Sequence, residues 1–111
     1  MNYEFKFIKG RRNTEVFRVP VHDPANVVSH ILNEDGNINP DSLSKIELIV
    51  GDVIISTETS EIMWKNDVIQ IKPSNTKLLS LPKRAHSELV AYNNDEGTTI
   101  GHGIVIVVGY G

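Results

Sequence analysis

The strongest constraint on the fold is a period-two alternation of apolar and polar residues that recurs in short runs along most of the chain. Near the N-terminus, Tyr3, Phe5 and Phe7 alternate with Glu4 and Lys6. Successive side chains of a strand point to opposite sides of a sheet, so this pattern predicts a strand with one buried face. Runs of strand character follow at 16–21, 45–50, 53–56, 68–71, 88–92 and 100–108.

Turn-forming residues separate these runs at spacings of roughly 8–15 residues, which is typical of all-β domains. Gly51-Asp52 fits a two-residue hairpin with glycine at its first position. The last run contains Ile104–Val108, which is apolar without alternation and indicates either burial on both faces or an interior position in a sheet. The pattern predicts one domain over 1–111, an antiparallel immunoglobulin-like β-sandwich of about seven strands, with a small β-barrel as the alternative.

Four segments are less regular. Residues 22–43 read as a long loop with at most one short helix, starting at Asp23-Pro24, which would be too short to be stable unless packed. Residues 62–64 either start a strand or lie in a bend, and 93–97 is predicted to be a polar loop. Leu78, Leu79 and Leu81 form a short apolar patch between two proline-containing turns.

Composition excludes several classes of function. The 111 residues include 11 Lys and Arg, 14 Asp and Glu and no cysteine, for a net charge of −3. This balance offers no cation surplus for binding nucleic acid, and without cysteine there are no disulfides, zinc–thiolate sites or thiol nucleophiles. No apolar run approaches the ~20 residues that span a bilayer, and the N-terminus lacks a signal peptide's apolar stretch. We expect a soluble protein of a reducing compartment with neither nucleic acid nor membrane as partner.

The four histidines include one distinctive element, His102 between Gly101 and Gly103. Such glycines could let the backbone approach a ligand while the imidazole transfers protons. They could also mark a β-bulge or a crowded crossing of strands, which we favour. No second histidine stands at metal-pair spacing, and no serine elbow or phosphate loop is present. We therefore predict no enzyme activity, no cofactor, no metal site and no catalytic residue.

Candidate partner-binding residues come from three places in the sequence. A basic turn follows the first strand, and an acidic loop precedes the last one. The single tryptophan, Trp64, is either a core ring packed against the opposite sheet, which we favour, or a platform for sugars. The candidates are Lys9, Arg11, Arg12, Trp64, Asn94, Asp95 and Glu96. The long loop 22–40 is a further contact candidate.

The order of motifs resembles that of small immunoglobulin-like structural proteins of tailed phages and prophages. Residues 41–72, DSLSKIELIVGDVIISTETSEIMWKNDVIQIK, are similar to a family segment with an Ile/Val-x-Leu strand, Gly-Asp and a return strand. Phe7-Ile8-Lys9-Gly10 is similar to the family's opening strand and glycine. Leu81-Pro82, the strand 88–92, the loop 93–97 and Gly101–Ile104 correspond downstream in order. One departure is 83–86, Lys-Arg-Ala-His, where the family has glycine followed by an aromatic residue.

The resemblance implies a non-catalytic virion component of the tail, baseplate or head-decoration type, including the N-terminal domain of baseplate upper proteins. Its partners would be other virion proteins, bound through edge strands and loops in a homo-oligomer or repeated array, in the virion or in the host cytoplasm during assembly. Alternatives are a carbohydrate- or host-surface-binding domain using Trp64, Tyr92 and Tyr110, and a phage-encoded inhibitor of a host protein. The enzymatic alternative is a hydrolase using His102.

Overall fold

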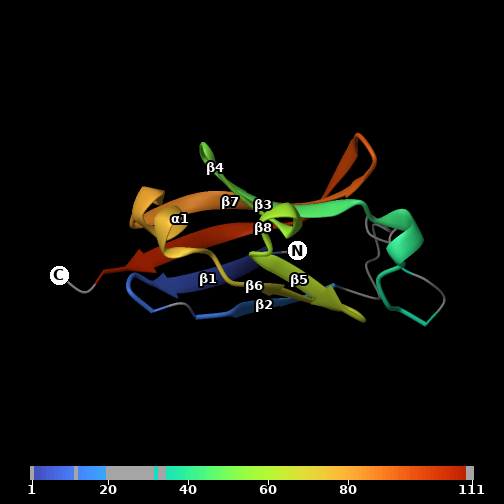
Figure 1. Ribbon diagram of the computed structural model, residues 1–111, viewed down its shortest axis with the longest axis horizontal. Coiled ribbons are helices and arrows are strands. Elements are labelled where there is room, and N and C mark those ends of the chain that lie inside the picture. Colours follow the sequence, from blue (N-terminus) through green and yellow to red (C-terminus); the bar gives the residue numbers. More distant parts are fainter. Residues whose placement is uncertain (1, 12, 20–31, 33–34, 110–111) are drawn as a thin grey trace.

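The structure, a computed structural model, describes residues 2–11, 13–19, 32 and 35–109. Within them, eight strands form two sheets that face each other (Figure 1). The five-stranded sheet has the order β1 (Asn2–Ile8), β8 (Glu96–Val108), β7 (Arg84–Asn93), β3 (Lys45–Val50), β4 (Val53–Ser56). The three-stranded sheet has the order β2 (Glu15–Arg18), β6 (Val68–Ile71), β5 (Ile62–Lys65). The predicted all-β sandwich is confirmed, with eight strands where about seven were expected. Because the strands pair in two separate sheets, the barrel alternative is wrong.

One pair of strands departs from the predicted antiparallel arrangement. β1 runs parallel to β8, in register from Asn2 opposite His102 to Ile8 opposite Val108. The other pairs, β2–β6, β3–β4, β3–β7, β5–β6 and β7–β8, are antiparallel. A parallel pair needs a long connection between its strands. Here that connection is most of the chain, so no local sequence pattern predicts the pairing of β1 with β8.

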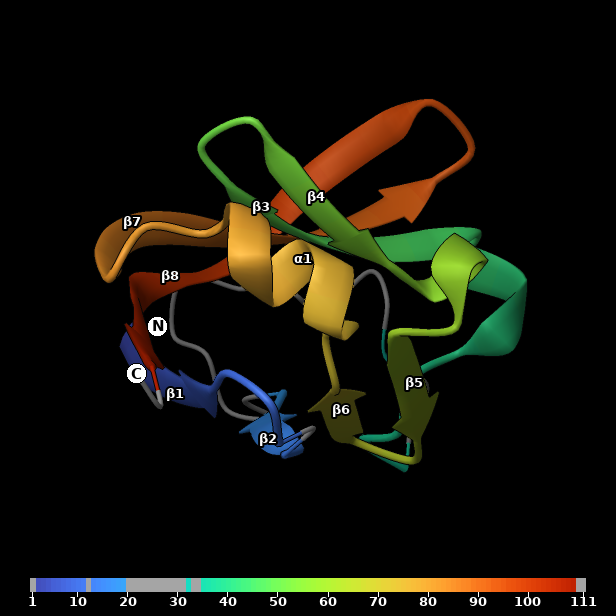
Figure 2. The same ribbon diagram turned by 60° about the vertical axis from the view of Figure 1, so that its left-hand side comes forward.

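The α-helix found among the described residues lies where the sequence showed only an apolar patch. α1 (Asn75–Ser80) begins after Ser74, whose side chain accepts a hydrogen bond from the Lys77 amide. Leu78 is buried, while Leu79 is 71% exposed. Figure 2 shows α1 at the opening between β4 and β6, where it covers one end of the core. Six residues are too few for a helical period to stand out in the sequence.

The short helix that the sequence allowed from Asp23-Pro24 lies outside the described residues. The described end of the segment 22–43 contains a 3-10 helix, η2 (Pro40–Ser42), which the Asn39 side chain caps by accepting from the Asp41 amide. A second 3-10 helix, η3 (Thr57–Thr59), follows β4. Residues 62–65 form a full strand rather than a bend.

The β7–β8 hairpin is longer than predicted. β7 starts at Arg84 rather than Glu88, and Asn93 pairs with Glu96, so the expected loop 93–97 is a two-residue turn with Asn94 at φ 57°. The Gly51-Asp52 hairpin is confirmed, since Val50 pairs with Val53 and Gly51 has φ 59°.

The core lies between the two inner faces. It includes Phe5, Phe7, Phe17, Ile46, Leu48, Ile55, Ile69, Ile71, Leu89 and Val105, each less than 5% exposed. Of the two alternatives predicted for Ile104–Val108, the interior sheet position is confirmed, because β8 lies between β1 and β7, whereas burial on both faces is wrong. Val105 and Val107 point into the core, but Ile104 and Ile106 are only half-buried and Val108 is 36% exposed. The physical reason is that none of the helices and strands that the structure describes packs as a second layer on the outer face of this sheet.

Candidate functional site

The Gly-His-Gly element lies where β8 passes between β1 and β7. A Cβ on Gly103 would clash with the Tyr3 carbonyl group, and one on Gly101 would lie 3.0 Å from the Phe17 ring. His102 alternates with these glycines and is exposed on the outer face. A register shift between Leu89 and Val90 marks a bulge beside this crossing. The structural interpretation of the two glycines is confirmed, because they permit close approach of strands and rings.

Tyr3 fills the space that these glycines leave. Its ring stacks on Phe5 with centroids 4.2 Å apart and meets the Phe17 ring edge-on at 5.9 Å. Its hydroxyl is hydrogen-bonded to the Ser87 hydroxyl at 2.7 Å. Burial raises the pKa of Tyr3 to about 12, with a smaller opposing effect from the Ser87 hydrogen bond. The phenol therefore stays neutral at ordinary pH and fastens β1 to β7 across β8.

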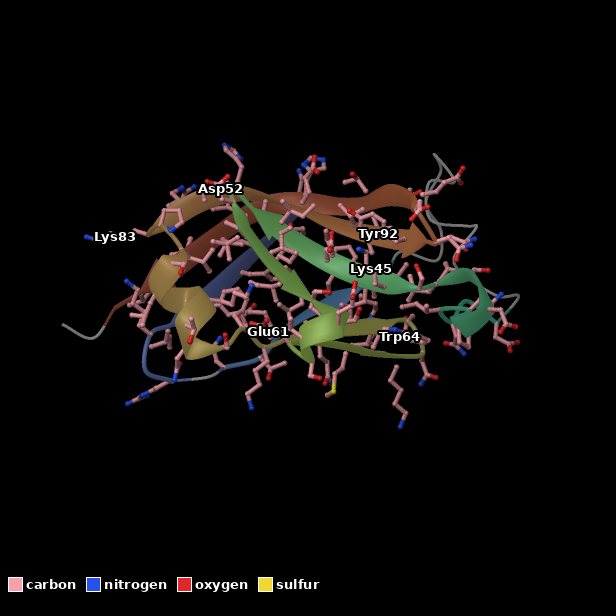
Figure 3. The ribbon with its side chains drawn as sticks, turned by 45° about the horizontal axis from the view of Figure 1, so that its top comes forward. Lys45, Asp52, Glu61, Trp64, Lys83 and Tyr92 are labelled. Atoms are coloured by element: carbon pink, nitrogen blue, oxygen red, sulfur yellow. The ribbon has the colours of Figure 1, made fainter. Side chains whose placement is uncertain are left out.

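The buried carboxylate of Glu61 has a structural role. It accepts hydrogen bonds from the Thr59 hydroxyl at 2.6 Å and from the Ser74 backbone amide at 2.8 Å. Figure 3 places it near η3 and α1, the elements that these bonds connect. Both carboxylate oxygens are thus engaged in holding neighbouring turns, as buried charged groups require.

Side chains close part of the outer edge of β1. Asn13 accepts a hydrogen bond from the Ile8 amide at 3.0 Å and donates one to the Lys6 carbonyl at 2.8 Å. The Glu15 carboxylate accepts from the Lys6 amide, and burial still raises the pKa of Glu15 overall. An incoming strand would have to break these bonds to pair with Lys6 and Ile8. This is a protection against edge-to-edge association.

The outer edge of β4 is closed in a similar way. The ammonium group of Lys77, on α1, donates to the Ile54 carbonyl at 2.8 Å. Strand addition at this position would displace a charge-assisted hydrogen bond. These contacts at β1 and β4 make the edges of the five-stranded sheet weaker candidates for docking than the sequence predicted.

The outer face of the three-stranded sheet displays apolar side chains. Val16, Gln70 and Met63 form one row across β2, β6 and β5. Val16 is 54% exposed and Met63 is 61% exposed. The next row is Arg18, Val68 and Lys65. We call these six residues the β2–β6–β5 face. It combines exposed apolar groups with two cations.

A charged network occupies the outer face of the five-stranded sheet near β3. The Lys45 ammonium lies 3.4 Å from Glu47, 3.5 Å from Glu58 and 4.7 Å from the centre of the Tyr92 ring. Glu47 raises the pKa of Lys45 by its negative charge, and its hydrogen bond raises the pKa of Tyr92. Figure 3 shows Lys45 and Tyr92 close together. The Lys45 ammonium is therefore surrounded by the two carboxylates and the Tyr92 ring, so these groups interact with one another within the chain.

The predicted partner-binding residues do not converge on one site. Lys9 follows β1 and donates its backbone amide to Val108, while exposed Arg11 lies in the same connection. The β7–β8 turn lies at the other end of the molecule (Figure 1). Trp64 is half-buried against the core. Arg12 lies outside the described residues, and Asn94, Asp95 and Glu96 are exposed at the β7–β8 turn.

The sequence reasoning missed Val16 and Met63, the most exposed apolar residues of the sheets. A signal was present at Val16, which occupies the position of the alternation that should carry a polar residue. Met63 lies between Ile62 and Trp64, and three apolar residues in a row hide which of them points outward.

Among the described residues, no group of three His, Asp or Glu side chains could hold a metal ion. No helix in the described part of the chain is long and apolar enough to cross a membrane. No protein-family model, curated protein or solved structure matches this chain.

Proposed function

We propose that this chain is a non-enzymatic structural module that binds another protein of a tailed-phage or prophage particle through the β2–β6–β5 face. The observation that carries the proposal is the row of Val16, Gln70 and Met63, which exposes apolar side chains on a sheet face. The sequence resemblance to phage structural proteins supplies the class of partner.

The exposed apolar groups give such docking its driving force. Full burial of a valine or methionine side chain contributes roughly 1.5–3 kcal/mol. Val16 and Met63 are 54% and 61% exposed, so a partner could gain about 1–2 kcal/mol from covering each. One such contact is weak. Repeated copies on a particle would add their contacts through effective concentration, so the array attaches firmly.

The charges beside this row define the partner's chemistry. Lys65 is exposed, and Arg18 forms an ion pair with Asp67 at 3.0 Å while its side chain stays 71% exposed. A partner surface that places carboxylates around an apolar centre would complement this arrangement. Its binding would weaken as salt screens the rim charges.

Co-sedimentation tests the proposal. The purified protein is mixed with heads, tails and baseplates from a lysate of the phage-carrying host, and the bound fraction is measured after particle sedimentation. We expect Met63→Asp to weaken binding at least about tenfold, because it buries an unpaired charge in the contact. Leu79→Asp is the matched control, since Leu79 is 71% exposed on α1, away from this face. Failure of the wild-type protein to sediment, or equal binding by both variants, would contradict the proposal.

The glycan-binding alternative is less well supported by the aromatic side chains. Trp64 is half-buried against the core, and the Lys45 ammonium lies 4.7 Å from the centre of the Tyr92 ring. Tyr110 lies outside the described residues. A sugar platform needs an open aromatic face, so we retain protein docking as the proposed function.

A further inference from the structure

The outer face of β1, β8 and β7 has an apolar centre. β8 is the middle strand of this group, and its outward side chains in the relevant segment are His102, Ile104 and Ile106. Ile104 and Ile106 are half-buried by their neighbours, while the alternating Val105 is fully buried in the core. Two isoleucines in the middle of an outer sheet face are typical of a surface that another layer covers.

The strand register arranges charges around these isoleucines in rows. One outer row is Lys6, Ile106 and Arg84, and the row at the other end is Asn2, His102 and Glu88. The middle row is Glu4, Ile104 and His86. On β7, therefore, the cation Arg84 and the anion Glu88 lie at equal distances on either side of the middle row.

Arg84 and Glu88 are too far apart to pair within one chain. Four residues of a strand separate them by about 13 Å. Both side chains are exposed, and among the described residues neither is in an ion pair. Each is therefore available to a second molecule.

Symmetry then decides how a second copy would fit. Consider a two-fold axis that lies between the two copies and runs parallel to the middle row. It places the copies face to face, with the strands of the second copy running opposite to those of the first. Each strand then lies over its own equivalent, so Arg84 of one copy faces Glu88 of the other, twice per dimer. At the axis Ile104 faces Ile104, and Glu4 and His86 also face their own equivalents, so two Arg84–Glu88 pairs of opposite charge are set against one Glu4–Glu4 pair of like charge. A two-fold axis along β8 would instead bring Lys6 against Arg84, which like-charge repulsion disfavours.

We propose that a second copy of this chain packs on the outer face of β1, β8 and β7, forming a two-fold dimer closed by reciprocal Arg84–Glu88 ion pairs. Such an isologous contact is the commonest form of oligomer. With strands about 4.8 Å apart, the outer face of β1, β8 and β7 is roughly 15 Å wide and 20 Å long, so the contact buries about 600 Å² in total. This lies well below the standard interface size, so we expect a weak dimer with a Kd in the upper micromolar range.

A charge-swap experiment tests this geometry. Sedimentation equilibrium gives the dimer Kd of the wild-type protein, of Arg84→Glu, of Glu88→Arg and of an equimolar mixture of the two variants. Each variant alone places two like-charge pairs in the contact, and we expect its Kd to rise at least about tenfold. In the mixture both pairs are again opposite, so we expect a heterodimer within about threefold of the wild-type Kd.

The mixture also controls for folding, because an unfolded variant could not restore association. The wild-type protein gives an independent readout: raising NaCl from about 0.05 to 0.5 M should weaken its dimer at least about threefold. A wild-type protein that stays monomeric at high concentration, variants that dimerise like the wild type, or a mixture without restored association would each overturn the inference. So would a dimer insensitive to salt. Particle binding through the β2–β6–β5 face would be unaffected by these outcomes.

Discussion

Replacing Gly103 by alanine tests the role of the glycines beside His102. The added Cβ would clash with the Tyr3 carbonyl oxygen and would lie 2.8 Å from the carbonyl carbon, about 0.6 Å short of the 3.4 Å at which ordinary contact begins. The nearest atoms belong to the backbone, so no rotamer change relieves the overlap. β1 must therefore move away from β8 in this region.

The expected cost follows from what this movement breaks. Overpacking of a tight site costs roughly 1–3 kcal/mol. Loss of the hydrogen bond between Tyr3 and Ser87, or of a backbone bond beside it, adds about 1 kcal/mol. Alanine recovers about 0.5–1 kcal/mol through its better strand propensity. We expect Gly103→Ala to lower the free energy of unfolding by about 2–3 kcal/mol, out of a total of roughly 5–15.

Urea denaturation followed by circular dichroism measures this difference. Two variants serve as controls. His102→Ala removes an exposed side chain, and Gly109→Ala adds a Cβ whose nearest neighbour, Lys9 Cδ, is 3.8 Å away. Both should stay within about 0.5 kcal/mol of the wild type. If Gly103→Ala were as stable as these controls, the close approach of β1 and β8 would be refuted.

Two further predictions concern the edge of β1 and the phenol of Tyr3. Asn13→Ala removes two hydrogen bonds to the outer edge of β1, so we expect a loss of about 1–2 kcal/mol and faster aggregation by light scattering; unchanged aggregation would mean that the edge is not exposed to pairing. The pKa of Tyr3 is raised from 10.0 to about 12, so the stability that its neutral form contributes is present below pH 10 and is lost as the pH rises toward 12. Denaturation at several alkaline pH values should therefore show a steeper decline for the wild type than for Tyr3→Phe, and parallel declines would contradict the burial of this phenol.

The sequence predicted the parts of the fold that local patterns determine. The alternation at Tyr3, Phe5 and Phe7 assigned the core face of β1 correctly, and Gly51-Asp52 defined its hairpin. The parallel pairing of β1 with β8 joins the two ends of the chain, and α1 has only six residues. Neither leaves a periodic signal, so both were missed.

The candidate surfaces were predictable to a smaller extent. Lys9 and Asn94 were correctly placed in turns, because turn residues bound each strand. The alternation of the second strand carried a signal that Val16 faces outward, but Met63 and Ile104 lie in runs without alternation and could be assigned to outer faces only from the paired strands. The sequence therefore predicted the positions of the turns well, but it predicted poorly which face of a sheet each apolar side chain occupies.

The central claim is that this chain is a structural component whose sheet faces contact other proteins of a particle. Quantitative mass spectrometry of phage particles, purified from a host that carries the gene, tests it most directly. We predict that the chain is present in a fixed number of copies per particle. Particles that lack the chain, with all of it left behind as free protein in the lysate, would contradict the account.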